Sequence, residues 1–304
     1  MTRPAEFEIR HPTMGDRPAW AAVRRWTPGL AQALQASGVT VVSIEKEWDD
    51  QGQGLGFLAT CGANVRELVV SAQHVRDLAV LAELPRLEKL SVCCPVDTAD
   101  FARLPSLREC WISPPAALGN VTASPTLRRL GLSRLELRDL APLKDLVALR
   151  ELHLSKLRIR DLAPLKDLVA LRELDLSELR RLAALTGIES LPLERVNLIY
   201  IPRLASIAPL EGLPLRRVEI AGCGRIADIA GLGRVTSLEK VEIHSGPELP
   251  SLDFLQMLVG LDDLSVVNTG IRGCGARWAH SPCWIDYATS HFGPGETASR
   301  TWQT

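Results

Sequence analysis

The stretch RDLAPLKDLVALREL occurs at residues 138–152 and again, letter for letter, at residues 160–174, a spacing of 22 residues. An active site is usually assembled once, from residues contributed by different parts of a fold. A tandem copy of this length instead indicates a structural unit that is used more than once. We therefore expect a chain built from stacked repeats.

The pattern LxxLxL extends this repeat in both directions. Its ten copies are 20 to 23 residues apart and begin at Val65, Leu87, Leu107, Leu127, Leu149, Leu171, Leu193, Leu215, Leu238 and Leu261. A period of this size is typical of a solenoid, in which each unit covers the apolar residues of the next.

The copies resemble leucine-rich repeats, and specifically the bacterial form with a DLxPLxxLxxL segment. That segment reads DLAPLKDLVAL twice and SIAPLEGLPL at 206–215. The resemblance covers roughly residues 65–271. It implies an α/β solenoid, a horseshoe or arc with a parallel β-sheet on the concave face and short 3₁₀, helical or irregular segments on the convex face.

One position departs from the family pattern. Three residues beyond each strand, such repeats usually carry an Asn that ties neighbouring turns together, but this chain has other residues there, such as Leu157, Leu179 and Ile201. Buried backbone groups still need partners. We therefore expect water or local turns to satisfy them.

Spacing within one unit predicts which side chains are buried. Leu174 and Leu176 are two residues apart, so on a strand both point to one face, while Asp175 points to the other. Leucines 162, 165 and 168 follow at steps of three, which suits a 3₁₀-like or helical return segment.

We divide the chain into three parts: 1–64, an N-terminal helical cap with a first atypical strand; 65–271, the solenoid; and 272–304, a C-terminal cap. In the first part, Thr27 as N-cap, Pro28, an apolar stripe and Gly38 predict a helix. An earlier helix is expected around Ala19–Trp26. VTVVSI at 39–44 predicts a strand beside residues 68–70.

Charge and composition limit the possible partners and compartments. The 35 Lys and Arg nearly balance the 36 Asp and Glu, so the chain as a whole lacks the basic field that drives nucleic-acid binding. There is no run of 18 apolar residues and no secretion signal at the start, which argues against a membrane span and against export. An odd number of cysteines, seven, favours a reducing, cytoplasmic compartment.

The sequence holds no familiar catalytic motif, so we expect a protein that is not an enzyme and has no cofactor. The glycine-rich stretch QGQGLGF at 51–57 lacks the Lys-Ser/Thr of a phosphate-binding loop and is interpreted as a connection. An alternative is an enzyme or a metal-dependent module in the C-terminal segment. The residues that could serve it are Cys274, His280, Cys283 and His291. Their spacing matches no common zinc pattern.

The strand face that points away from the core is the remaining candidate. Its middle positions form one row, made of Val69, Ser91, Trp111, Gly131, His153, Asp175, Asn197, Glu219, Glu242 and Ser265. The positions two residues earlier form a second row, made of Glu67, Lys89, Glu109, Arg129, Glu151, Glu173, Arg195, Arg217, Lys240 and Asp263.

We expect this face to bind another protein. Trp111 is placed outward between the small residues Ser91 and Gly131, and exposed aromatic rings often anchor interfaces. The predicted contacts are Trp111, His153, Asp175, Asn197, Glu219 and Glu242, with Tyr200 near the rim. Two alternatives stay open: the charges are simply solvated, or an end segment folds back and covers Trp111.

Overall fold

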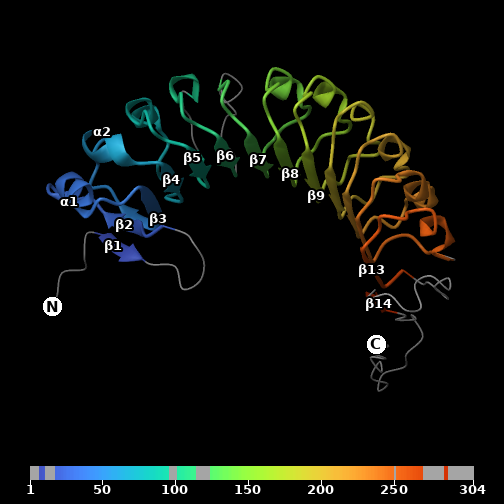
Figure 1. The fold of residues 1–304 in the computed structure, drawn as a ribbon. Helices are drawn as coiled ribbons and strands as arrows, with labels where there is room; N and C mark the ends of the chain where they lie inside the picture. The colour runs from blue at the N-terminus through green and yellow to red at the C-terminus, as the bar shows by residue number, and fades with distance from the viewer. Residues whose placement is uncertain are drawn as a thin grey trace. The chain divides into compact units, whose positions relative to one another are not determined.

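The computed structural model describes residues 7–10, 18–95, 101–113, 124–249, 251–269 and 284–286 (Figure 1). The chain divides into two compact units, Met1–Glu136 and Leu137–Thr304. In each unit the strands form one layer and the 3₁₀ helices lie on the opposite side of the core (Figure 1).

Unit 1 contains a sheet in sequence order. Its strands are β1 (Phe7–Arg10), β2 (Trp20–Arg25), β3 (Val41–Asp49), β4 (Glu67–Val70), β5 (Lys89–Val92), β6 (Glu109–Ile112) and β7 (Arg129–Ser133). β1 pairs with β2 antiparallel, and every later pair in the unit is parallel. Its helices are α1 (Leu30–Ser37), α2 (Leu58–Cys61), η1 (Gly62–Asn64), η2 (Ala79–Glu83) and η3 (Phe101–Arg103).

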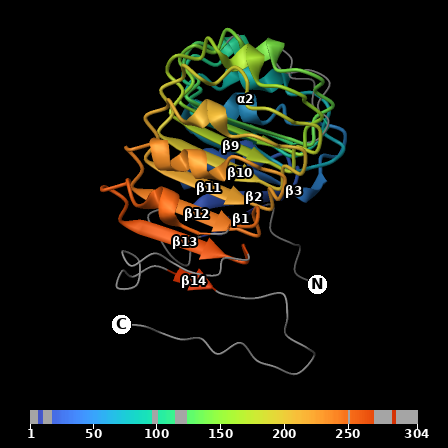
Figure 2. The same cartoon turned by 90° about the vertical axis from the view of Figure 1, so that its right-hand side faces the viewer.

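In unit 2 the described strands pair in parallel, and Figure 2 shows them one after another from β9 to β13. They are β8 (Glu151–Ser155), β9 (Glu173–Ser177), β10 (Arg195–Ile199), β11 (Arg217–Ala221), β12 (Lys240–His244), β13 (Asp263–Val267) and β14 (Trp284–Asp286). The 3₁₀ helices are η5 (Ala141–Leu143), η6 (Ala163–Leu165), η7 (Ala208–Leu210), η8 (Ile229–Arg234) and η9 (Asp253–Leu255).

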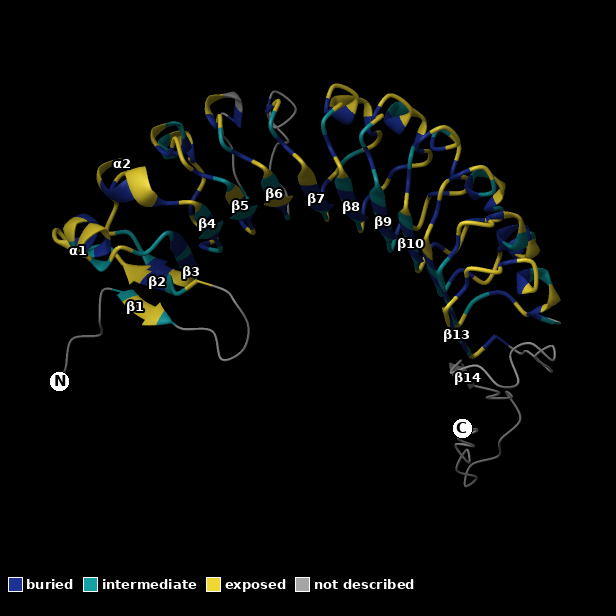
Figure 3. Cartoon of the chain, in the orientation of Figure 1, coloured by how far each residue is buried: buried dark blue, intermediate teal, exposed yellow. Residues whose placement is uncertain are grey.

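The core lies between the strands and the return segments, as the colouring by burial shows (Figure 3). Leu174 and Leu176 are at most 1% exposed, while Asp175 between them is only partly buried. The leucines at 162, 165 and 168 of the return segment are completely buried. The expected register, with alternate strand residues inward and a 3₁₀ return path, is therefore confirmed.

Acidic side chains begin the 3₁₀ helices of the duplicated segments. Asp139 accepts a hydrogen bond from the backbone N–H of Ala141 at 3.0 Å, and Asp161 accepts one from Ala163 at 3.2 Å. These carboxylates satisfy an N–H group that the short helix leaves without a partner. The Asp of the DLxPL motif therefore stabilises the start of its own 3₁₀ helix.

A backbone ladder takes the place of the missing Asn side chains. The residue that follows each strand from β8 to β12 has a positive φ, and its N–H donates to the last carbonyl of the next strand at 2.7–3.0 Å; these residues are Lys156, Glu178, Tyr200, Gly222 and Ser245. The next position along the chain is apolar and buried, as at Leu157, Leu179 and Ile201. The turns are therefore tied together by backbone hydrogen bonds between successive repeats, and not by the water or local turns that we expected.

The N-terminal part corrects two predictions. Residues 20–25 form strand β2 and not a helix, because Ala21, Ala22 and Val23 are completely buried and the strand pairs on both sides, with β1 and β3. Helix α1 has Gly29 as its N-cap, without a side-chain cap, so Thr27 is not the cap. The Oγ1 atom of Thr27 is buried without a hydrogen-bond partner among the described residues.

The other N-terminal predictions are confirmed. Helix α1 ends at Gly38, whose φ of 67° is the left-handed conformation that suits a helix C-cap. The strand expected at 39–44 is the first half of β3, where Ser43 pairs with Val69 of β4. Among the described residues, no helix is both long enough and apolar enough to cross a lipid bilayer.

Candidate functional site

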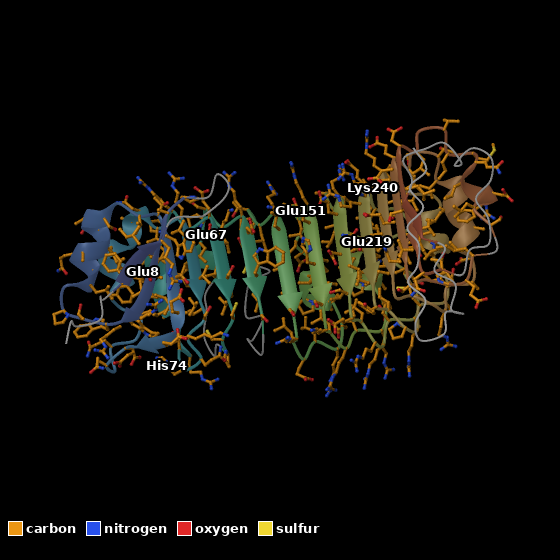
Figure 4. The ribbon with its side chains drawn as sticks, turned by 90° about the horizontal axis from the view of Figure 1, so that it is seen from below. Glu8, Glu67, His74, Glu151, Glu219 and Lys240 are labelled. Atoms are coloured by element: carbon orange, nitrogen blue, oxygen red, sulfur yellow. The ribbon has the colours of Figure 1, made fainter. Side chains whose placement is uncertain are left out.

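The open strand face of unit 2, defined as the side of the sheet opposite the 3₁₀ helices, carries a row of polar side chains in register. This polar row consists of His153, Asp175, Asn197, Glu219 and Glu242, one from each strand from β8 to β12. All five side chains are partly buried by their neighbours. Figure 4 shows this face, with Glu151, Glu219 and Lys240 labelled. The row predicted from the repeat is therefore present in this unit.

Asp175 joins three neighbouring strands. Its Oδ2 lies 3.5 Å from Nδ1 of His153 and accepts a hydrogen bond from Nδ2 of Asn197 at 3.3 Å. Burial favours the neutral carboxyl, but the hydrogen bonds from His153 and Asn197 outweigh it and lower the pKa of Asp175. In the first half of the polar row, the carboxylate of Asp175 is therefore already stabilised by its neighbours His153 and Asn197.

Glu219 is in a different situation. Burial, and then the neighbouring carboxylate of Glu242, raise the pKa of Glu219 above its ordinary value. Within the described part of the chain, its carboxylate has neither a hydrogen bond nor an ion pair. Glu242 lies 3.4 Å from Nζ of Lys240, but that ammonium group is shared with Asp263 at 2.8 Å, and the hydrogen bond to Asp263 raises the pKa of Lys240.

The second row of unit 2 forms pairs along the sheet. Glu151 and Glu173 are neighbours in this row, and Arg195 from the next strand forms an ion pair with Glu173 that reduces the negative charge there. Lys240 forms an ion pair with Glu242 of the same strand. The least compensated negative charge of the polar row is therefore at Glu219.

Tyr200 lies beside the strand face, in the turn that follows β10. It is 62% exposed, and its φ of 53° is left-handed. Its ring covers Gly222 of the next turn, where an added Cβ would lie 2.5 Å from Cδ1 of Tyr200. Tyr200 thus presents one face of its ring to solvent, while the other face packs against the protein.

In unit 1, Trp111 occupies the row between Ser91 and Gly131, as predicted. The side chain is 36% exposed, and its indole Nε1 donates to Oε1 of Glu109 at 2.7 Å. The ring fills the space that the missing side chain of Gly131 leaves open, because an added Cβ on Gly131 would lie 2.0 Å from Cε3 of Trp111. One face of the indole therefore rests on the sheet.

The candidate metal site at Cys274, His280, Cys283 and His291 lies outside the described residues. Within the described ranges, no three His, Cys, Asp or Glu side chains are grouped so that they could hold a metal ion. The free thiols in these ranges belong to Cys61, Cys93, Cys94, Cys110 and Cys223.

The turns that follow the strands hold charged side chains that the alternating strand pattern does not predict. A hollow in unit 2 is lined by Arg160, Arg180, Arg181, Ala183 and Arg203. The signals were visible as RIRD at 158–161 and LRRL at 179–182, directly after the LxL strands.

Known proteins were compared with the chain in three ways. No family model and no curated protein matches it. Among solved structures it is similar to an internalin, InlF, from Listeria monocytogenes, with 18% identity, 86% of this chain and 91% of that chain covered, and a TM-score of 0.57. Internalin C2 from the same species gives 22% identity, coverage of 71% and 92%, and a TM-score of 0.49. The plant peptide hormone receptor RGFR1, in complex with RGF2, has 11% identity and a TM-score of 0.48, with 81% of this chain and 46% of that chain covered.

The parallel strands, the 3₁₀ return segments and the ten LxxLxL copies define a solenoid repeat protein. The similarity to InlF then shows which solenoid fold the chain has. The chain has the leucine-rich repeat fold, as the DLxPLxxLxxL segments suggested.

Proposed function

We propose that the protein is a non-catalytic interaction module that binds a partner protein on the open strand face. The environment of Glu219 is the observation that supports this proposal. Its partly buried carboxylate lies beside Glu242 and has neither a hydrogen bond nor an ion pair among the described residues, although Lys240 and His244 are near enough to lower its pKa slightly. A partially desolvated negative charge is stabilised when an opposite charge comes close.

The partner that fits this site presents a basic side chain. A Lys or Arg placed between Glu219 and Glu242 would form charge-assisted hydrogen bonds and relieve the repulsion between the two carboxylates. Asn197 and His153 extend the polar row on the same side and offer further polar contacts. Fold analogy supports a binding role but names no partner.

Trp111 gives unit 1 its own candidate contact. The ring is partly exposed and already held in place by Glu109 and by its packing against Gly131. Little side-chain freedom is then lost on binding, which favours affinity. We propose that the exposed face of this ring anchors the partner in unit 1.

The test is a binding titration against a partner recovered from the native cell by affinity purification with the full chain. We expect Trp111→Ala to weaken binding by about 2 kcal/mol, as the truncation of an anchor residue does. Glu219→Gln removes the charge but keeps the shape, so it should slow association and reduce its salt dependence.

Controls come from the opposite side of the core. Lys144→Ala and Lys166→Ala lie just beyond the 3₁₀ helices of the duplicated segments, away from the open strand face. They should leave affinity unchanged, and circular dichroism checks that every variant is folded. Full affinity in Trp111→Ala and Glu219→Gln, with loss in either lysine variant or after truncation at Ile271, would move the site off the strand face.

A further inference from the structure

Arginines gather along one edge of unit 2, at the turns where β8, β9 and β10 end. Figure 4 shows nitrogen-tipped side chains along the edge toward which the strand arrows point. Arg160, Arg180, Arg181 and Arg203 line a hollow there, together with the small side chain of Ala183. Four arginines from three successive repeats thus line one space.

The repeat explains why they meet. Arg181 and Arg203 occupy the same position in successive repeats, 22 residues apart, and Arg160 and Arg180 come from the turns after β8 and β9. Parallel strands lie about 4.8 Å apart, so equivalent turn positions are neighbours along the edge. The turns therefore hold these positive charges close together.

No counter-charge within the described residues neutralises the cluster. All four arginines are exposed, and in that part of the chain none of them forms a hydrogen bond or an ion pair through its guanidinium group. Of the acidic groups nearby, Glu178 is paired with Lys156 at 3.0 Å, and Asp161 accepts the backbone N–H of Ala163. The hollow is therefore positive and open to a ligand.

The chemistry of guanidinium favours an oxyanion with several acceptor atoms. Its planar fork matches carboxylate and phosphate oxygens with two parallel hydrogen bonds. A carboxylate has two oxygens and one charge, whereas a phosphate monoester has three terminal oxygens and a charge near −2 at pH 7. A hollow lined by four arginines is better matched by the phosphate.

A second hollow adjoins the first and indicates what carries the phosphate. It is lined by Glu178, Arg180, Tyr200, Pro202 and Gly222, so that Arg180 belongs to both. Tyr200 and Pro202 supply apolar surface directly beside the positive hollow. A phosphate monoester could place its charged end among the arginines and its carbon part against Tyr200.

We propose that the hollow formed by Arg160, Arg180, Arg181 and Arg203 is a binding site for a phosphate monoester. The ester belongs either to a small phosphorylated molecule or to a phosphorylated side chain of a protein. This site lies at the turns and not on the strand face, so it is independent of the function proposed above.

Calorimetric titration of the full chain at constant ionic strength tests the proposal. The probes are inorganic phosphate, a phosphoserine peptide, its unphosphorylated form and a single-stranded oligonucleotide. We expect phosphate and the phosphopeptide to bind, and Arg203→Ala and Arg181→Ala each to weaken binding about tenfold, the effect of losing a hydrogen bond to a charged group. Arg180→Lys keeps the charge but loses the fork, and should also weaken binding.

Arg150→Ala is the matched control. Arg150 is exposed and lies just before β8, at the opposite end of the strand, and its guanidinium group has no hydrogen bond or ion pair among the described residues. It removes one positive charge from the same unit but should leave phosphate affinity unchanged.

The pattern of binding separates the two sources. A phosphopeptide that binds much more tightly than inorganic phosphate supports a phosphorylated side chain, and similar affinities support a small molecule. Three results overturn the proposal: no heat with phosphate or phosphopeptide, equal loss in Arg150→Ala and Arg203→Ala, or binding of the oligonucleotide alone.

Discussion

The contact between Trp111 and Gly131 leads to a prediction that can be worked out from the structure. A Cβ added to Gly131 would lie 2.0 Å from Cε3 and 2.4 Å from Cζ3 of the indole ring. Non-bonded carbon atoms at this distance repel each other strongly, so Gly131→Ala must displace the ring. The backbone of Gly131 is not left-handed and therefore accepts alanine.

The expected sign of the effect depends on whether Trp111 is present. In the wild-type background, Gly131→Ala overpacks the contact and should lower the free energy of unfolding by about 1–3 kcal/mol. In a Trp111→Ala background the clash is gone. Alanine is then preferred to glycine inside a strand by about 0.5–1 kcal/mol, so the same substitution should stabilise.

Urea denaturation followed by circular dichroism measures all four proteins of this double-mutant cycle. The coupling energy should be on the order of 2 kcal/mol, because the two residues are in direct contact. Gly212→Ala is the control, since nothing lies within 4 Å of an added Cβ there. If Gly131→Ala changes stability equally in both backgrounds, the ring does not rest on Gly131 and the geometry described for Trp111 is wrong.

Three further predictions concern the core, the polar row and the thiols. Leu174→Ala leaves a cavity at a buried position and should lower the free energy of unfolding by about 2–5 kcal/mol, whereas Asp175→Ala should lower it by about 1 kcal/mol. If denaturation shows the reverse order, the strand register described above is wrong. Since the folded state raises the pKa of Glu219, it favours the protonated form, and this contribution to stability is lost as pH rises through the folded pKa. Glu219→Gln should therefore stabilise the protein at pH 7 and lose this advantage below the unfolded pKa; an equal effect at both pH values would contradict the assignment. We predict seven free thiols; Cys93 should react in the native protein, while Cys110, whose pKa burial raises to about 12, should react only after unfolding. Disulfides in freshly isolated protein would argue against the proposed reducing, cytoplasmic compartment.

The repeat made the strand register predictable. A period of 22 residues places equivalent residues side by side, and His153, Asp175 and Asn197 align as the sequence indicated. The hydrogen bonds among them follow from this alignment and from their chemistry. Arg195, however, pairs with Glu173 and not with Glu219, and that choice depends on side-chain rotamers that no sequence pattern determines.

The N-terminal part was harder to predict because the repeat pattern is absent there. Residues 20–25 read WAAVRR, in which alanine suits a helix and a short apolar run also suits a buried strand. Pairing with β1 and β3 decided the outcome, and neither neighbour can be inferred from local sequence. Strand β14 was missed for a related reason, because three residues, Trp284–Asp286, give no periodicity.

The arginine hollow shows why the net charge of this chain is a poor guide to its surfaces. The formal net charge is −1, which argued against an anionic partner. A solenoid places each repeat position in its own column, so charges of opposite sign can cancel in the sum while lying on different surfaces. In unit 2 the strand position carries Glu219 and Glu242, and the turn position carries Arg181 and Arg203. A cationic ligand and an anionic ligand can therefore each find a complementary surface on the same unit.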